Sequence, residues 1–560
     1  MSAQTGRPSL PDGPPSSHAL DRAKARITRY QNDPNPVWIR ELRQSARLSR
    51  TPIILAVVTG MVTLLICSVG GVASVSAEPA KVGIALFHTF FSVAFSVVTW
   101  VGPAVAANTI ASERGGRTWE ALLLTGLDHA TIARGKFLAA LTYVSLYIVM
   151  LAPVGALPFL FGGVTATEVL TAFVLLFWFA VLSVAFGLSI SSKFSTPAVA
   201  IVVTLLVAIP LSMMVYVALG PLLSMAVHEL WPSVPDGPPV WLPTAYVRAD
   251  FGLQYLALLV LCPVAAVALP AWLLYEVTLA NMAGPSDDRS SGLRRWFALS
   301  APLVCALCLL PGLIARSVEW QLAGTSCFIA FLLFAAFLFL GEPLGPSRRV
   351  RVHWQRAGES FRQRYFGPGI LPASSLLFVV GVLGLLVHLA VGGWLQLSKT
   401  AATSALDAQR VGAFIGYLCA FFVFVVGFCV WARARALTSA VPRLLLLGVL
   451  FLASVGPWIA MAIAGIATQR STSALIVAAP SPSYALVLVE TLGSPTAERD
   501  LVLGAGAICA AAWALLGLGL YGLGRARTRK TLASYDAAHE QLEALLRSED
   551  AQQHPAAAAG

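Results

Sequence analysis

One charged segment between two long apolar stretches, residues 111–136, holds the residue types best suited to specific recognition. Thr118 can cap a short helix there, and Glu120 in its first turn suits the positive end of the helix dipole. Gly126 would end that helix, and Asp128 can cap the next one. Three apolar residues recur at i, i+3 and i+4 and share one helix face: Trp119, Leu122 and Leu123. The segment predicts a short amphipathic helix whose apolar face a partner with a hydrophobic groove could grip.

A second charged segment, residues 34–50, precedes the first apolar stretch. Asn35 is a competent N-cap, and Pro36 suits the first helical position. Its cations recur at spacings of 3, 4 and 3 and share one face: Arg40, Arg43, Arg47 and Arg50. Another face is apolar: Trp38, Ile39, Leu42 and Ala46. We expect an interfacial amphipathic helix, with its arginines towards lipid phosphates and Trp38 towards acyl chains. A simple anchor that orients the first span is the alternative.

Residue patterns typical of catalysis are absent from the sequence. Gly135-Lys136 lacks the preceding glycine and the following hydroxyl residue of a G-x-x-x-x-G-K-S/T phosphate loop. Neither H-E-x-x-H nor G-x-S-x-G occurs. His88 and His388 lie within apolar stretches, where a bond to a neighbouring helix is a better interpretation than a proton path. We therefore expect no catalytic, cofactor-binding or metal site in this chain.

The composition is that of a chain solvated mainly by lipid. Hydrophobic residues make up 57% and charged residues 12%, and the mean hydropathy is +0.76, whereas soluble domains carry about 25% charged residues. The net charge of +11 does not indicate nucleic acid as a partner, since most cations lie in short loops between apolar stretches. There they suit contact with anionic membrane lipids.

The apolar stretches predict an all-α, polytopic bundle of twelve membrane spans in two sets of six. The first set is expected near 51–75, 82–110, 137–162, 166–191, 197–217 and 254–277. The second set is expected near 298–315, 322–341, 371–396, 411–431, 443–466 and 503–524. With the N-terminus inside, 31 of the 38 Lys and Arg residues fall on the cytoplasmic side. This bias predicts that both termini are cytoplasmic.

The same pattern divides the chain into segments. We expect a disordered N-terminus (1–33), an interfacial helix (34–50) and a first six-span domain (51–281). A linker (282–297), a second six-span domain (298–525) and a cytoplasmic helix with a disordered tail (526–560) should follow. A turn of Pro, Ser or Thr, and Tyr lies between the fifth and sixth spans of each set, which indicates a tandem repeat or coincidence. The basic loop 342–370 is either a second partner-binding loop or a lipid anchor, and both interpretations stay open.

The charged segment 111–136 resembles the corresponding loop of the type-2 ABC permeases, whose pattern is close to E-R-E-x-G-T-L-E-x-L-L-x-T-P-L followed by I-x-x-G-K. The matching residues are Glu113, Arg114, Thr118, Glu120, Leu122, Leu123, Thr125, Leu127, Ile132, Gly135 and Lys136. The helix before the first span is also similar to that family, and the resemblance covers residues 34–281. Arg117 stands where the family has Gly, Trp119 where it has Leu, and Gly126 where it has Pro.

The resemblance implies that this loop is a coupling helix that docks on a nucleotide-binding subunit. The implied coupling residues are Glu113, Arg114, Arg117, Thr118, Trp119, Glu120, Leu122 and Leu123. It further implies the permease subunit of an ATP-driven exporter in the inner or plasma membrane, with MgATP on the partner. We expect either a homodimer or a pseudo-dimer within one chain as the transport unit, and the sequence leaves both open. The excess of Arg over Lys favours a bacterial source. An ion-gradient-driven secondary transporter is the main alternative, and a membrane glycosyltransferase or lipid-modifying enzyme is a third class.

Overall fold

The computed structural model describes the chain as helices joined by short turns, without a strand in the parts described. These parts are residues 34–46, 50–75, 78–219, 242–284, 287–347, 365–398, 404–468, 475–493 and 499–553, with short pieces within 227–231 and 349–354. Three predicted features lie wholly or partly outside them: the tail 1–33, Arg47, and residues 348, 352–353 and 355–364 of the basic loop 342–370. The all-α prediction is confirmed.

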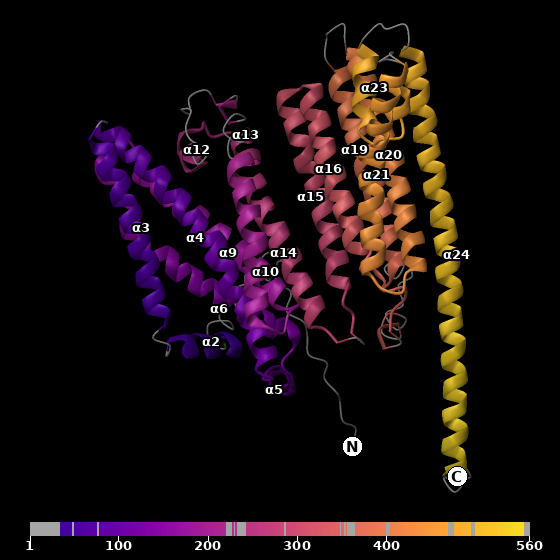
Figure 1. The fold of residues 1–560 in the computed structure, drawn as a ribbon, viewed down its shortest axis with the longest axis horizontal. Helices are drawn as coiled ribbons and strands as arrows, with labels where there is room; N and C mark the ends of the chain where they lie inside the picture. The colour runs from indigo at the N-terminus through magenta and orange to yellow at the C-terminus, as the bar shows by residue number, and fades with distance from the viewer. Residues whose placement is uncertain are drawn as a thin grey trace, which may run out of the picture. The chain divides into compact units, whose positions relative to one another are not determined.

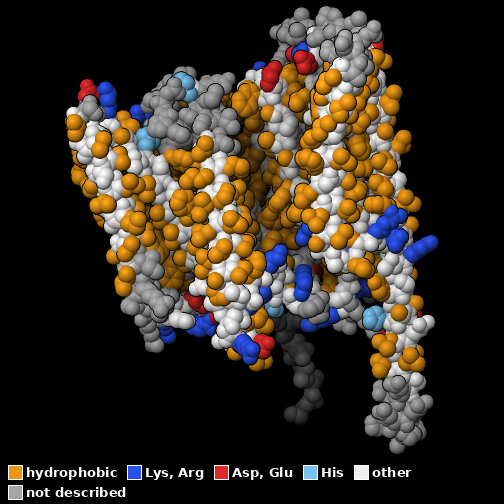
Figure 2. All heavy atoms as spheres, in the orientation of Figure 1, with side chains coloured by type: hydrophobic (Ala, Val, Ile, Leu, Met, Phe, Trp, Pro, Cys, Tyr) orange, Lys and Arg blue, Asp and Glu red, His pale blue; other side chains and the backbone are white. Residues whose placement is uncertain are grey.

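Twelve described helices are long and apolar enough to cross a membrane, and each overlaps one predicted span. They are α3 (Arg50–Ser74), α4 (Pro79–Gly115), α6 (His129–Met150), α9 (Ala166–Ser191), α10 (Pro197–Met214), α14 (Cys262–Met282), α15 (Ser291–Ala315), α16 (Val318–Phe339), α19 (Ile370–Leu397), α20 (Ser404–Arg435), α21 (Ala440–Thr468) and α24 (Arg499–Gln553). Hydrophobic side chains cover their sides, and charged ones gather at their ends (Figure 2). The chain is a multi-pass membrane protein.

The third span differs from the predicted 137–162. The helix α6 begins at His129 and ends at Met150, and two short helices follow it, α7 (Ala152–Gly155) and α8 (Leu157–Phe161). Each short helix carries a proline in its first turn, where the missing N–H costs nothing. The same prolines cannot continue a helix that precedes them. The apolar run therefore continues while the helix does not.

The last span is longer than predicted, because the helix expected after residue 525 is continuous with it. The helix α24 runs unbroken from Arg499 to Gln553 and extends well past the other helices of its unit (Figure 1). Gly524 lies inside it and costs only about 1 kcal/mol relative to alanine. The change from apolar to charged residues at Arg525 marks a change of surroundings, and the backbone does not bend there.

The chain forms two compact units, which are described separately. The first comprises residues 1–251 and 264–282, and the second comprises 252–263 and 283–560. In the first unit α4 is central and packs against α6, α9 and α10, with Phe90 and Ala94 fully buried in its core. In the second unit α20 is central and packs against α16, α19 and α24.

Each unit also places a short helix between its fifth and sixth long helices. In the first unit this is α12 (Leu242–Arg248), which packs against the fourth long helix, α9. In the second unit it is α23 (Tyr484–Gly493), which packs against the fourth long helix, α20. These are the positions of the two Pro, Ser or Thr, and Tyr turns. The shared placement favours a tandem repeat over coincidence.

Glycines allow α24 to lie closely against α20. A Cβ added at Gly517 would lie 2.6 Å from the backbone of Phe424, whereas one added at Gly519 would meet no atom within 4 Å. We expect Gly517→Ala to lower the midpoint of thermal unfolding in detergent, because the two helices must separate. Gly519→Ala is the matched control and should raise it slightly through helix propensity. Equal effects of the two substitutions would contradict this packing.

Candidate functional site

The predicted N-cap is confirmed, and it does more than start a helix. Asn35 Oδ1 accepts hydrogen bonds from the backbone N–H groups of Val37 (3.0 Å) and Trp38 (3.4 Å) at the start of α2 (Pro36–Ala46). Its Nδ2 donates to the carbonyl oxygen of Thr131 in α6, at 2.8 Å. One side chain thus caps α2 and fixes it to α6, so that α2 lies across the ends of the long helices of its unit (Figure 1).

A glycine lets α2 approach α6 this closely. A Cβ added at Gly135 would lie 2.6 Å from both Asn35 Oδ1 and Val37 Cβ. The side chain of Val37 is 2% exposed and belongs to a cluster with Ile132 of α6. The glycine and the isoleucine of the I-x-x-G-K motif therefore form the surface of α6 against which α2 packs.

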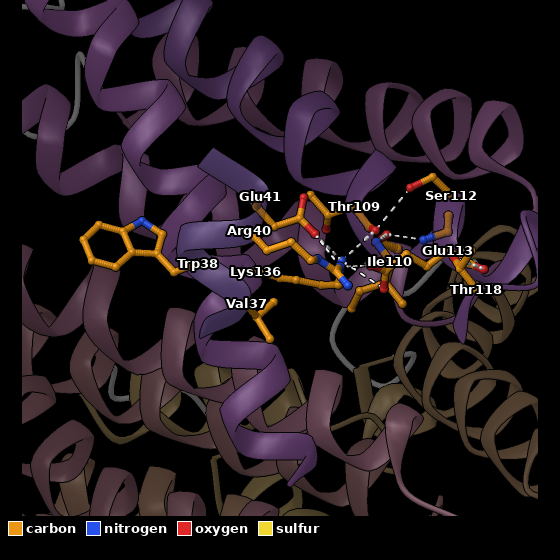
Figure 3. Close-up of polar contacts among 12 residues, drawn as sticks. Val37, Trp38, Arg40, Glu41, Thr109, Ile110, Ser112, Glu113, Thr118 and Lys136 are labelled. Carbon is orange, nitrogen blue, oxygen red and sulfur yellow. Dashed lines mark hydrogen bonds and ion pairs between the residues drawn. The ribbon is translucent and has the colours of Figure 1, made fainter. Parts of the chain in front are cut away.

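The lysine of that motif is the centre of a buried network of charges (Figure 3). The Lys136 side chain is fully buried, and its Nζ lies 3.1 Å from both Glu41 Oε1 and Glu113 Oε2. It also donates to the carbonyl oxygen of Thr109, at 3.1 Å. Arg40 completes the network, since its Nη2 contacts Glu113 Oε1 and lies 3.1 Å from Glu41 Oε1. Two cations and two anions from α2, α4 and α6 thus neutralise each other.

The arginines of α2 do not all behave as predicted. Arg40 was expected to face lipid phosphates, but it turns to Glu113 and Glu41 because these carboxylates accept charge-assisted hydrogen bonds from its guanidinium. Partial burial alone would lower the pKa of Arg40, yet the bonds to Glu41 and Glu113 outweigh burial and raise it. Arg43 is exposed, and nothing is described of the Arg50 side chain. Trp38 points away from the network and donates from Nε1 to Thr142 Oγ1, at 3.3 Å.

The chain turns sharply at the end of α4, just before the short helix begins. The N–H of Thr118 donates to the carbonyl oxygen of Glu113 (3.0 Å), and the N–H of Arg117 donates to that of Arg114 (3.4 Å). This is the Schellman pattern, which needs a left-handed residue after the cap. Arg117 has that conformation, with φ +57°. Glycine would adopt this conformation without the steric cost that arginine bears.

Arg117→Gly should relieve this conformation. A non-glycine residue in the left-handed region costs roughly 1–2 kcal/mol, part of which glycine returns through the entropy of the unfolded chain. We expect the substitution to raise the midpoint of thermal unfolding in detergent. Ser112→Gly, within the regular part of α4, is the control. It should lower the free energy of unfolding by up to about 1 kcal/mol, and the midpoint with it. A lower midpoint for Arg117→Gly would show that its side chain matters more than its backbone.

The short helix exists as predicted, but two predicted details are wrong. The helix α5 (Trp119–Leu124) ends where expected, before Gly126 with φ +73°. Thr118 does not cap it through its side chain, because its hydroxyl donates back to the carbonyl of Glu113, at 3.3 Å. Asp128 precedes α6 without a capping bond from its side chain.

The apolar face of α5 points into its own chain, which corrects the picture of a free apolar face. Leu122 is 5% exposed and lies in the cluster with Val37 and Ile132, and Trp119 and Leu123 pack against the same cluster. The guanidinium of Arg114 lies over the Trp119 ring, 5.3 Å from its centroid. These residues hold α5 in place and leave its opposite face uncovered.

The uncovered face, called here the α5 edge, consists of exposed residues of mixed character. They are Arg117, Thr118, Glu120, Ala121 and Leu124. Leu124 is 87% exposed and is the large aliphatic side chain of this edge. Three of these residues, Arg117, Thr118 and Glu120, are among the coupling residues that the resemblance implies. Ala121 and Leu124 are not among them, because the hydrophobic pattern of the sequence identifies the packed face of the helix.

Sequence reasoning also gave Gly135 and Lys136 no role of their own. A signal for them existed, because a lysine at the start of an apolar stretch needs a carboxylate partner when it is buried. The ion pairs of Lys136 and Arg40 connect α2, α4 and α6. Among the described residues no group of three or more His, Cys, Asp or Glu could hold a metal ion.

Comparison with known proteins gives one match. Residues 39–242 match the model of a family described as ABC-2 family transporter protein. No curated protein and no solved structure matches the chain. The matched region contains Arg40, Glu41, Glu113 and Lys136, together with all of α5.

Proposed function

Because residues 39–242 match the model of the family described as ABC-2 family transporter protein, we propose that the chain is the membrane-spanning subunit of an exporter driven by a separate ATP-binding subunit. The α5 edge is the docking site, and MgATP is held by the partner. The loop 111–136 and both termini then lie in the cytoplasm, on the inner side of the inner or plasma membrane. The positive-inside bias of the loops supports this orientation.

The observation that carries the proposal is the connection of the α5 edge to three helices. Glu113 lies at the end of α4, just before α5, and its carboxylate is paired with Arg40 of α2 and Lys136 of α6. A displacement of α5 is therefore passed to all three helices by charge-assisted contacts, of which those of Lys136 are buried. Such an arrangement suits a helix that receives force from outside the membrane.

The composition of the edge indicates the chemistry of the partner surface. Leu124 offers one exposed aliphatic side chain, with Arg117 and Glu120 on the same uncovered face. A complementary groove would hold an apolar pocket for Leu124 and charges opposite to those beside it. The buried Leu122 and the half-buried Trp119 pack against the cluster of Val37 and Ile132 and position the edge.

The experiment that tests this function asks which energy source moves the chain. The full chain is purified from its native membrane in mild detergent, and an ATP-binding protein should purify with it. In proteoliposomes of this complex, MgATP should change the rate at which maleimide labels a Leu124→Cys variant, with or without ionophores. An ion-gradient carrier would give the opposite result, with no ATP-binding protein retained and labelling that follows the gradient.

A further inference from the structure

The second unit contains a fully buried arginine that no motif identified. Arg294, in the first turn of α15, donates from Nη1 to Glu342 Oε1 and to Ser290 Oγ, both at 2.9 Å. Its Nε donates to the carbonyl oxygen of Phe366, at 3.1 Å. Both residues are buried: Arg294 is 0% exposed and Glu342 is 3% exposed.

These partners belong to the two ends of one loop. Glu342 follows α16, and Phe366 lies shortly before α19, so Arg294 contacts the chain both where the loop leaves α16 and where it returns to α19. The N–H of Ile370 also donates to the carbonyl of Pro343, at 3.0 Å. The base of the loop is therefore closed.

The same base is attached to a fourth helix. Arg433 of α20 donates from Nε to the carbonyl oxygen of Glu342, at 2.8 Å. Together these contacts connect α15, α16, α19 and α20, and α20 is the central helix of its unit. We call Arg294, Glu342 and Arg433 the base clamp.

The first unit closes its corresponding loop in a similar way. There Glu113, at the end of the second long helix, pairs with the fully buried Lys136, near the start of the third. In the second unit Glu342 follows the second long helix and pairs with the fully buried Arg294. Both loops join the second and third long helices of their unit. The loop of the second unit lacks the coupling-helix sequence pattern of residues 111–136. A buried cation nevertheless closes both loops.

We propose that Arg294 and Glu342 are positioning residues that pass movement of the loop between α16 and α19 into the helices of the second unit. This inference rests on the proposed function, because the movement comes from an ATP-driven partner on the side of the membrane where the loop lies. A buried ion pair is a costly way to stabilise a fold. A rigid connection between four helices and a loop is what the pair provides.

The test measures whether movement at the loop reaches the far end of the unit. Single cysteines replace Ser347, on the loop, or Arg316, in the exposed turn between α15 and α16, after the eight natural cysteines have been replaced. Maleimide labelling is measured in the complex with its ATP-binding subunit, with and without MgATP. The base clamp is changed by Glu342→Gln or Arg294→Lys. Asp407→Asn is the control, since it breaks an ion pair with Arg410 at the other end of α20.

In the otherwise unchanged chain, MgATP should alter labelling at both positions. In Glu342→Gln and Arg294→Lys, the response at residue 347 should persist while that at residue 316 falls by about 2- to 30-fold, the range seen when a coupling contact is removed. Arg294→Lys is informative because lysine keeps the charge but cannot hold several partners in fixed directions. The Asp407→Asn control should retain both responses.

Two results would overturn the inference, and both can be distinguished from a failure of the proposed function. If the base-clamp variants keep both responses, Arg294 and Glu342 only stabilise the fold. If MgATP changes labelling at Leu124→Cys but not at residue 347 in the unchanged clamp, the second unit receives no movement through this loop. If MgATP changes labelling at none of the three positions, the proposed function itself fails.

Discussion

Replacing Lys136 by methionine is expected to destabilise the protein by about 3–5 kcal/mol, the usual cost of removing one partner of a buried ion pair. Lys136 is fully buried and contacts Glu41, Glu113 and the carbonyl of Thr109. Without it the two carboxylates lose their fully buried cation. The expected result is a large fall in the midpoint of thermal unfolding in detergent and in the yield of folded protein.

Lys81→Met is the matched control for that substitution. Lys81 also forms an ion pair, with Glu78, but both side chains are more than 70% exposed. Exposed pairs contribute roughly 0–1 kcal/mol, so the control should unfold almost as the unchanged protein does. If Lys136→Met were equally mild, the buried network would not be what holds α2, α4 and α6 together.

The second large effect separates the two faces of α5. Leu122→Asp places a carboxylate in the cluster with Val37 and Ile132, where it has no partner, and should cost several kcal/mol of stability. Leu124→Asp changes a side chain that is 87% exposed and should change stability by about 0.5 kcal/mol or less. Thermal unfolding of both variants in detergent measures this difference.

Leu124→Asp, the variant with the smaller effect on stability, should have a large effect on partner binding. Leu124→Asp should reduce recovery of the ATP-binding subunit by about 30-fold or more, as expected for a central interface residue worth 2 kcal/mol or more. It should do so while the chain stays folded. A folded Leu124→Asp variant that retains its full complement of ATP-binding subunit would remove the α5 edge from the docking site.

The spans could be predicted from the sequence because lipid imposes a simple rule on composition. Every helix in a bilayer must be apolar over about 20 residues, so α9 and α19 appear in the sequence within a few residues of their observed ends. The rule fails where apolar residues continue past a helix end, as at Leu151, or where a helix continues past the apolar residues, as in α24.

The existence of α5 could be predicted, but its orientation could not. Trp119, Leu122 and Leu123 define an apolar face by their spacing alone, and spacing does not say whether that face meets a partner or the same chain. The answer depends on Val37, which is distant in sequence, and on how the following helix places Ile132. The pairing of Arg40 with Glu113 escaped prediction for the same reason, since 73 positions separate them.

The base clamp of the second unit could not be predicted from any local pattern. Arg294 and Glu342 are 48 positions apart, and each lies beside an apolar stretch where a solvated charge is the ordinary interpretation. Only the folded chain shows that the arginine is buried and that Phe366 also contacts it. Long-range pairs of buried charges are therefore what the structure adds to the sequence.

The most direct measurement is site-specific photocrosslinking from residue 124 in native membranes. A photoreactive phenylalanine analogue replaces Leu124 at the α5 edge, or Leu146, an exposed position near the end of α6, as the control. The account predicts an adduct between the chain and an ATP-binding protein from position 124 and none from position 146. Crosslinks from position 124 only to lipid or to the chain itself, in a complex that still contains the ATP-binding protein, would contradict it.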